Sequence, residues 1–95
     1  MDFVIRFSEE KNQLLKSRRG ISFEEVVELI HQGNVLDDLK HPSPNRSTQR
    51  IYLVKIEKYV YAVPYVINAK KKEIFLKTIY ASRKYTKLYL KGEKR

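Results

Sequence analysis

The sequence predicts a single α+β domain over residues 1–95, in which two N-terminal helices pack on one face of a small antiparallel sheet and a C-terminal helical segment follows. Two observations indicate this class. Apolar residues recur at helical spacing between residues 21 and 33, whereas they alternate at strand spacing after residue 50. The three strands predicted after residue 50 are joined by links of two and five residues, which are lengths typical of antiparallel neighbours. The predicted order is therefore β-α-α-β-β-β-β-α.

The first strand and the first helix are predicted within the first 20 residues. Residues 3–7 alternate apolar and mixed positions, which indicates a short strand. Ser8 is expected to cap a helix whose first turn carries two glutamates, and Gly20 is a signal for its C-terminal end. The apolar content of this helix is limited mainly to Leu14 and Leu15. We therefore expect a surface helix with one narrow contact.

The second helix has the clearest local signal. Ser22 and Glu25 have the spacing of a capping box, in which each side chain accepts a hydrogen bond from the backbone N–H of the other residue. Apolar residues follow at i, i+3, i+4 and i+7 and predict one buried stripe, formed by Phe23, Val26, Val27 and Ile30. Gly33 ends this helix.

The remaining strands are separated by a polar loop at residues 41–49. Before the loop, Val35 and Leu36 predict the start of a second strand that two aspartates interrupt. After it, alternating residues predict strands at residues 50–57, 59–67 and 73–80. Pro64 has no backbone N–H for a strand partner, so it marks an edge-facing position or a bulge.

A last helical segment is predicted to begin at Ser82. Helical spacing places Lys84, Lys87 and Lys91 on one face, and Tyr85, Leu88 and Tyr89 on another. We expect the three aligned lysines to contact RNA phosphates.

The positive charge and the tyrosines are concentrated in the second half of the chain. Residues 1–45 hold six Lys/Arg against eight Asp/Glu, a net charge of −2, whereas residues 46–95 hold fourteen against three, a net charge of +11. All seven tyrosines lie after residue 50. Cations neutralise phosphates and aromatic rings stack on bases, so this half is suited to a nucleic acid. Because tyrosine also favours strands, we expect most of the tyrosines in the core.

Several classes of function are excluded by the residues that the chain lacks. Without cysteine it has no disulfide, thiol nucleophile or Cys-ligated metal. It contains no nucleotide-binding glycine loop and no Gly-x-Ser-x-Gly elbow, and its two histidines do not have zinc-site spacing. Asp37 and Asp38 are adjacent on a strand and should point to opposite faces, which excludes a paired-carboxylate site. No metal and no cofactor are expected. The sequence also lacks a bilayer-length apolar stretch and a signal peptide, so a cytoplasmic protein without a membrane role is expected.

Arginine, lysine, histidine and tyrosine remain, and they suffice for metal-free RNA cleavage. The RNA's own 2′-hydroxyl attacks the neighbouring phosphorus, and the protein orients the attack and neutralises the charge on the phosphorane. Arg50 at a strand start and Arg83 after the last strand are the predicted catalytic arginines, with His41 and Tyr80 as nearby groups that move protons. In a plain three-stranded meander, however, Arg50 and Arg83 would lie about 20 Å apart.

Three stretches of the chain, at residues 7–12, 20–26 and the paired positions 49–50 and 82–84, resemble the BrnT-type toxins of bacterial type II toxin–antitoxin systems. Phe7, Ser8 and Arg19 stand where that family has tryptophan, aspartate and histidine. The resemblance implies a RelE-like ribonuclease fold that arrests growth by cleaving RNA. It also implies a ribbon-helix-helix antitoxin as partner, with operator DNA contacted only through that antitoxin. By position, Arg50 and Arg83 match the site arginines of the family, and His41 lies in the corresponding loop.

Two other interpretations fit the same residues. The chain would be a non-enzymatic RNA- or DNA-binding module if its basic sheet only holds the ligand. Alternatively, it would be an inactive toxin relative that acts only within a repressor complex.

Overall fold

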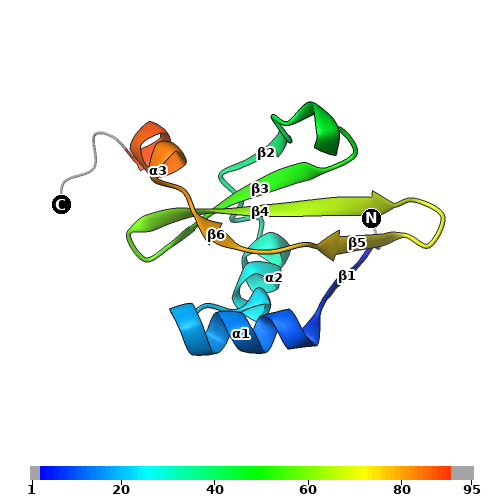
Figure 1. Cartoon of the computed structure of the whole chain (residues 1–95), viewed down its shortest axis with the longest axis horizontal. Helices are drawn as coiled ribbons and strands as arrows, with labels where there is room; N and C mark the ends of the chain where they lie inside the picture. The colour runs from blue at the N-terminus through cyan, green and yellow to red at the C-terminus, as the bar shows by residue number, and fades with distance from the viewer. Residues whose placement is uncertain (1–2, 91–95) are drawn as a thin grey trace.

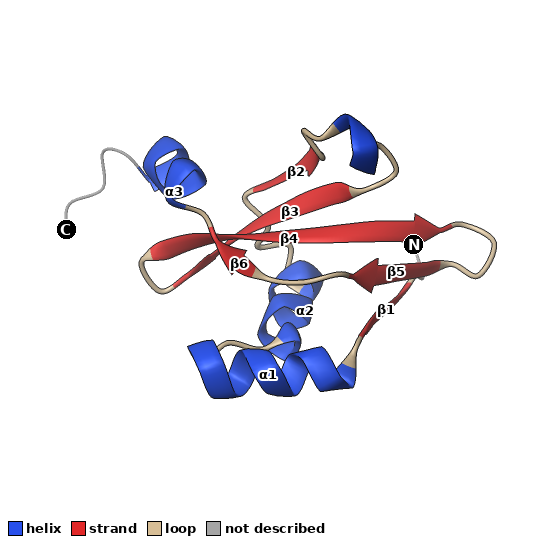
Figure 2. Cartoon of the chain, viewed as in Figure 1, coloured by secondary structure: helices blue, strands red, loops and turns tan. Residues whose placement is uncertain are grey.

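The computed structural model describes residues 3–90, and its elements follow the predicted order, with an additional two-residue strand before the last helix (Figure 1). The elements are β1 (Val4–Phe7), α1 (Glu9–Arg19), α2 (Phe23–His31), β2 (Asp37–Lys40), a 3₁₀ turn η1 (Pro44–Arg46), β3 (Arg50–Ile56), β4 (Tyr59–Asn68), β5 (Glu73–Leu76), β6 (Tyr80–Ala81) and α3 (Arg83–Leu90). The α+β class is confirmed. Figure 2 shows α1 and α2 on one side of the sheet and α3 on the other.

The sheet is mixed, which corrects the prediction of a purely antiparallel one. Its strand order is β1-β5-β4-β3-β2, and β6 pairs with β4 beyond the end of β5. Strands β2 to β5 pair antiparallel, but β1 runs parallel to β5, with Val4 opposite Glu73 and Phe7 opposite Leu76. Parallel strands need a long connection, and here the two helices and three further strands separate β1 from β5. The order of elements predicted from local spacing could not show which edge of the sheet β1 joins.

The face of the sheet that α1 and α2 cover holds the larger core. Phe23 and Val26 of α2 are fully buried, and the Phe23 ring stacks on that of Phe7 at 4.9 Å between centroids. From α1, Leu15 is buried but Leu14 is 46% exposed, so the helix makes the narrow apolar contact that was predicted, through Leu15. The capping box and the glycine stop at Gly20, which has a φ of 67°, are both confirmed.

A buried asparagine that the sequence did not reveal joins the two helices. Asn12 of α1 is fully buried, and its Oδ1 accepts a hydrogen bond from the backbone N–H of Phe23 at 2.8 Å. Its Nδ2 donates to Glu24 at 2.9 Å. That hydrogen bond lowers the pKa of the Glu24 carboxyl. Asn12 therefore satisfies the N-terminus of α2 and sets the angle between the helices.

The opposite face of the sheet carries a second, smaller core that α3 covers. Its fully or nearly fully buried residues are Ile51, Leu53, Val60 and Ala62. From α3, Tyr85, Tyr89 and Leu90 pack against them, whereas Leu88 is 61% exposed. Leu88, which was predicted on the same face as Tyr85 and Tyr89, therefore does not pack against the sheet with them. Ser82 is confirmed as the start of this segment, since its Oγ accepts the backbone N–H of Tyr85 at 3.1 Å.

The structure bears on two further predictions about the strands, the extent of the second strand and the position of Pro64. The aspartates do not interrupt the second strand, because β2 consists of Asp37–Lys40 and pairs with β3. Pro64 is edge-facing as predicted: its carbonyl accepts the N–H of Lys77 at 2.7 Å in the gap between β5 and β6, where its missing N–H has no strand partner. Within residues 3–90, every helix is too short or too polar to cross a bilayer.

Candidate nucleic-acid interface

Arg50 lies in a hydrogen-bonded group that we call the Asp38 cluster, formed by Asp38, Arg50, Tyr52 and Tyr65. The guanidinium Nε of Arg50 donates to Asp38 Oδ1 at 3.1 Å, and its Nη2 donates to the Asp38 carbonyl at 2.9 Å. The Tyr65 hydroxyl donates to both oxygens of the same carboxylate, at 2.7 and 2.8 Å. The ring of Tyr65 stacks on that of Tyr52, with centroids 4.0 Å apart. Each strand thus supplies one partner: β2 the acid, β3 the cation and β4 the phenol.

The electrostatics of the Asp38 cluster favour its internal bonds. The hydrogen bond to Asp38 raises the pKa of Arg50. Burial, and then the hydrogen bond to Asp38, raise the pKa of the Tyr65 phenol well above its usual value, so Tyr65 remains a donor throughout the neutral range. Two donors of Arg50 are therefore used inside the fold. This is the arrangement of a structural ion pair.

Of the other predicted catalytic residues, His41 lies beside Arg50 along the backbone, because Lys40 is paired with Arg50 and the next residue, His41, bonds Gln49, but Arg83 does not. Arg50 is paired with Tyr65 of β4, whereas the backbone N–H of Ser82, just before Arg83, bonds the carbonyl of Val60. These two points are five residues apart on β4, roughly 17 Å. Arg50 and Arg83 thus lie at opposite ends of the sheet.

His41 lies in the loop after β2, whereas the predicted RNA-binding lysines Lys84 and Lys87 lie on α3. The His41 backbone N–H bonds the carbonyl of Gln49 at 3.2 Å, and its Nδ1 accepts the N–H of Ser43 at 3.1 Å. A neutral imidazole in this arrangement carries its proton on Nε2. Lys84 and Lys87 are exposed on α3, while Lys91 lies outside the described residues.

Two adjoining pockets lie along the sheet edge where β5 stops and β6 begins. The first has a volume of about 310 Å³ and is lined by Lys11, Arg46, Gln49, Pro64, Lys77 and Thr78. The second has a volume of about 200 Å³ and is lined by Lys11, Leu14, Leu15, Arg18, Arg19, Thr78, Ile79 and Tyr80. Lys11 and Thr78 line both pockets, which therefore adjoin, and we call the two pockets together the basic groove.

The basic groove carries positive charge without compensation. Its five cations are Lys11, Arg18, Arg19, Arg46 and Lys77, and no aspartate, glutamate or histidine lines it. None of the five forms an ion pair with any acid in residues 3–90. The ammonium of Lys77 lies 5.7 Å from the centroid of the Phe75 ring, which also leaves it available to an anion. Such a surface suits the phosphates of a nucleic acid.

Sequence reasoning missed this groove, although one signal for part of it was present. Lys11, Leu15 and Arg18 recur at i, i+4 and i+7, which places them on one face of α1. No local pattern connects α1 with Arg46 in the polar loop or with Lys77 after β5, because the fold alone brings them together.

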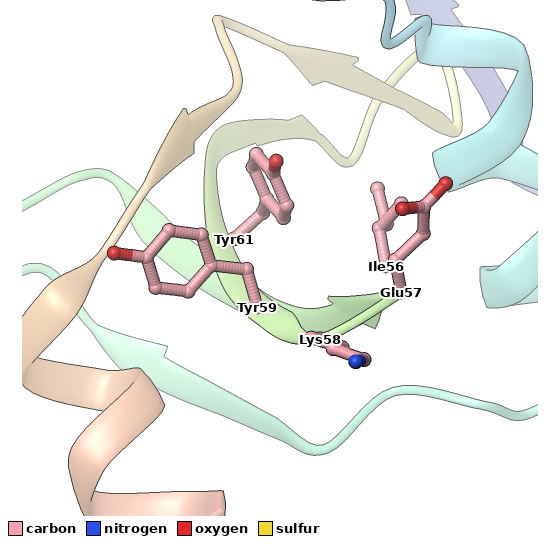
Figure 3. Close-up of a pocket in the computed structure, with 5 residues that line it drawn as sticks. All are labelled: Ile56, Glu57, Lys58, Tyr59 and Tyr61. Carbon is pink, nitrogen blue, oxygen red and sulfur yellow. The ribbon is translucent and has the colours of Figure 1, made fainter. Parts of the chain in front are cut away.

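Other hollows on the surface have a different chemistry. At the β3–β4 turn, a pocket of about 320 Å³ is lined by Ile56, Glu57, Lys58, Tyr59 and Tyr61 (Figure 3). Its two tyrosine rings meet edge to face at 6.3 Å. A further pocket beside α2 includes two glutamates among its lining residues. Acids contribute to both, so neither is suited to a polyanion as the basic groove is.

The basic groove offers guanidinium and ammonium donors, the amide of Gln49 and the hydroxyl of Thr78 to an anionic ligand. His41 is linked to it through the backbone of Gln49. Tyr80, one of the predicted catalytic residues, lines the groove directly, whereas Arg50 does not. Compared with known proteins, the chain matches no family model, no curated protein and no solved structure.

Proposed function

We propose that this protein is the toxin component of a type II toxin–antitoxin system that binds RNA along the basic groove and cleaves it without a metal ion. The observation that carries the proposal is the set of five cations in a groove without acids, on a chain with a formal net charge of +9. Each phosphate held by such a cation releases a condensed counterion, which drives binding. The resemblance of residues 7–12, 20–26, 49–50 and 82–84 to BrnT-type toxins supports the step from binding to cleavage.

The cleavage step uses groups at one end of the groove. The 2′-oxygen of the RNA attacks the adjacent phosphorus, loses its proton to solvent, and forms a 2′,3′-cyclic phosphate as the bond to the 5′-oxygen breaks. Arg46 and Lys77 neutralise the phosphorane that forms in between. The 5′-oxygen takes its proton from water as it leaves. His41, whose Nδ1 accepts the N–H of Ser43, presents its Nε2–H as a hydrogen-bond donor to that oxygen.

The partner proposed for this surface is a ribbon-helix-helix antitoxin with an acidic segment. An acidic segment lying over the basic groove would neutralise its cations and exclude RNA from it. Operator DNA would then be contacted only through the antitoxin.

The test is incubation of the purified protein with RNA in EDTA. We expect cleavage with chelator present, and its loss in the triple variant Lys11→Gln/Arg46→Gln/Lys77→Gln. The matched control is Lys58→Gln/Lys70→Gln/Lys71→Gln, which removes the same charge from exposed turns outside the groove. Equal loss of cleavage in the two triple variants would refute the groove as the site.

A non-enzymatic RNA- or DNA-binding module is the second candidate, and a specific observation favours it. No imidazole or carboxylate lines the basic groove, and Arg50 and Arg83 lie apart, so the described residues contain no compact set of proton-transfer groups around one phosphate. RNA that binds to the groove but stays intact in the same experiment would support this function instead.

A further inference from the structure

Tyr80 is the tyrosine whose ring is left without a ring partner in the described part of the chain. The other six pair with one another: Tyr52 with Tyr65, Tyr59 with Tyr61, and Tyr85 with Tyr89. Within residues 3–90, the hydroxyl of Tyr80 also forms no hydrogen bond, and no cation lies over its ring. It is nonetheless 39% exposed, so a large apolar ring surface meets solvent.

Tyr80 stands at the basic groove. It lines the second pocket together with Arg18 and Arg19. It is also paired with Ala62 of β4, and residues directly opposite one another in an antiparallel pair project from the same face. Pro64, two residues further along that face, lines the first pocket, about 7 Å away along the strand. Tyr80 therefore lines the second pocket at the sheet edge, and its side chain projects from the same face as Pro64, which lines the first pocket.

We propose that Tyr80 stacks on an unpaired base while the groove cations hold the phosphates on either side of it, so that the ligand is single-stranded RNA and not a duplex. This inference rests on the proposed function of the groove. A base in a duplex already has both faces stacked on its neighbours, whereas a base in a single strand offers a face to an aromatic side chain. The single-stranded ligand is therefore the one that uses both the cations and the exposed ring.

The experiment compares three ligands by fluorescence anisotropy: a short single-stranded RNA, the duplex of the same sequence, and inorganic polyphosphate. We expect Tyr80→Leu to weaken binding of the single strand about 5- to 150-fold, the range of one lost stacking contact, and to leave polyphosphate binding unchanged. Tyr80→Phe should bind as the wild type does, since it keeps the ring. The control is Tyr59→Leu, which removes a tyrosine that is also 39% exposed but lies at the β3–β4 turn, and it should leave all three affinities unchanged.

Three results would overturn the inference. The first is equal affinity of the wild type for the single strand and the duplex. The second is an equal loss in Tyr80→Leu and Tyr80→Phe, which would assign the effect to the hydroxyl. The third comes from one further ligand, the single-stranded DNA of the same sequence: if it bound as tightly as the RNA, RNA would be overturned as the ligand. Failure of the proposed function is distinguishable, because it would appear as unchanged polyphosphate binding in the Lys11→Gln/Arg46→Gln/Lys77→Gln variant.

Discussion

The Asp38 cluster and the basic groove are built from the same kinds of residue, yet these residues make very different contacts. In the cluster, Arg50 donates to Asp38, and the stacked ring of Tyr65 is 2% exposed. In the groove, the cations meet no acid, and the ring of Tyr80 is 39% exposed. The side chains of arginine and tyrosine in the cluster have partners within the fold, whereas those in the groove have neither an acid nor a ring partner in the part of the chain that the structure describes.

The contrast between the cluster and the groove separates cations that stabilise the fold from cations that can bind a ligand. Like charges gathered in a groove repel one another, which works against the compact state. Pairing with an acid would remove that repulsion, as it does for Arg50. A groove whose five cations have no ion-pair partner among residues 3–90 is therefore suited to an anionic ligand, and the following predictions test whether the groove and the cluster differ in this way.

The largest effect on stability is expected in the core under the cluster. Phe23→Ala should lower the free energy of unfolding by about 3–5 kcal/mol, because the fully buried ring leaves a cavity between α2 and the sheet. Urea denaturation measures it. Leu88→Ala, at a side chain that is 61% exposed, is the control and should change little. An unchanged midpoint for Phe23→Ala would show that the helix stripe is misassigned.

Tyr65→Phe should break the cluster without touching the groove. The variant keeps the stack on Tyr52 but removes the hydroxyl that donates to Asp38, at a cost of about 1.5–3 kcal/mol for bonds to a charged group. Affinity for RNA should stay that of the wild type. If Tyr65→Phe instead weakened RNA binding as strongly as groove variants do, the two regions would not be separate.

Variants of the basic groove should weaken RNA binding without lowering stability. Lys11→Gln/Arg46→Gln/Lys77→Gln should reduce the slope of log K against log salt for single-stranded RNA by about 2, at roughly 0.7 per lost phosphate contact. Its unfolding midpoint should not fall, because these cations have no described acid to lose. Binding isotherms over a series of salt concentrations measure the slope, and a slope equal to that of the wild type would contradict phosphate contact.

Arg50→Ala tests whether Arg50 stabilises the fold or takes part in catalysis. Because Arg50 is engaged by Asp38, we expect lower thermal stability, with growth inhibition reduced only as far as the amount of folded protein falls. Arg83→Ala, at an exposed position, should keep the melting temperature and is the companion measurement. Complete loss of growth inhibition by a stable, well-folded Arg50→Ala protein would place Arg50 in the catalytic machinery.

The smallest effect is expected at Asp37, which precedes Asp38 in β2 and projects from the opposite face. The Tyr89 hydroxyl donates to Asp37 at 2.6 Å, and this bond lowers the pKa of Asp37 below its ordinary value of 3.8. A lowered folded-state pKa contributes stability above the ordinary pKa that is lost as the pH falls through the folded value. Tyr89→Phe should therefore raise the pKa of Asp37 in a carboxyl NMR titration, while Tyr85→Phe should not. The same titration curve in all three proteins would show that the bond does not hold α3.

The elements themselves could be predicted from sequence because their signals act over a few residues. The bonds between Ser22 and Glu25 span one helical turn, and the glycine stop acts on the carbonyls of that same turn. Alternation along β3 and β4, joined by two residues, similarly determined the face to which Tyr52 and Tyr65 belong. Asp37 and Asp38 diverge as predicted, one toward Tyr89 of α3 and the other toward Tyr65.

Only the tertiary structure decided which distant residues meet. It paired β1 with the open edge of β5, gave Arg50 an acid partner twelve residues away, and placed Lys11 beside Arg46 and Lys77. It also left the ring of Tyr80 without a ring partner among residues 3–90 while pairing the rings of the other tyrosines. Contacts of this kind depend on how whole layers pack, and packing is selected by shape and burial across the domain, for which a stretch of a few residues carries no signal.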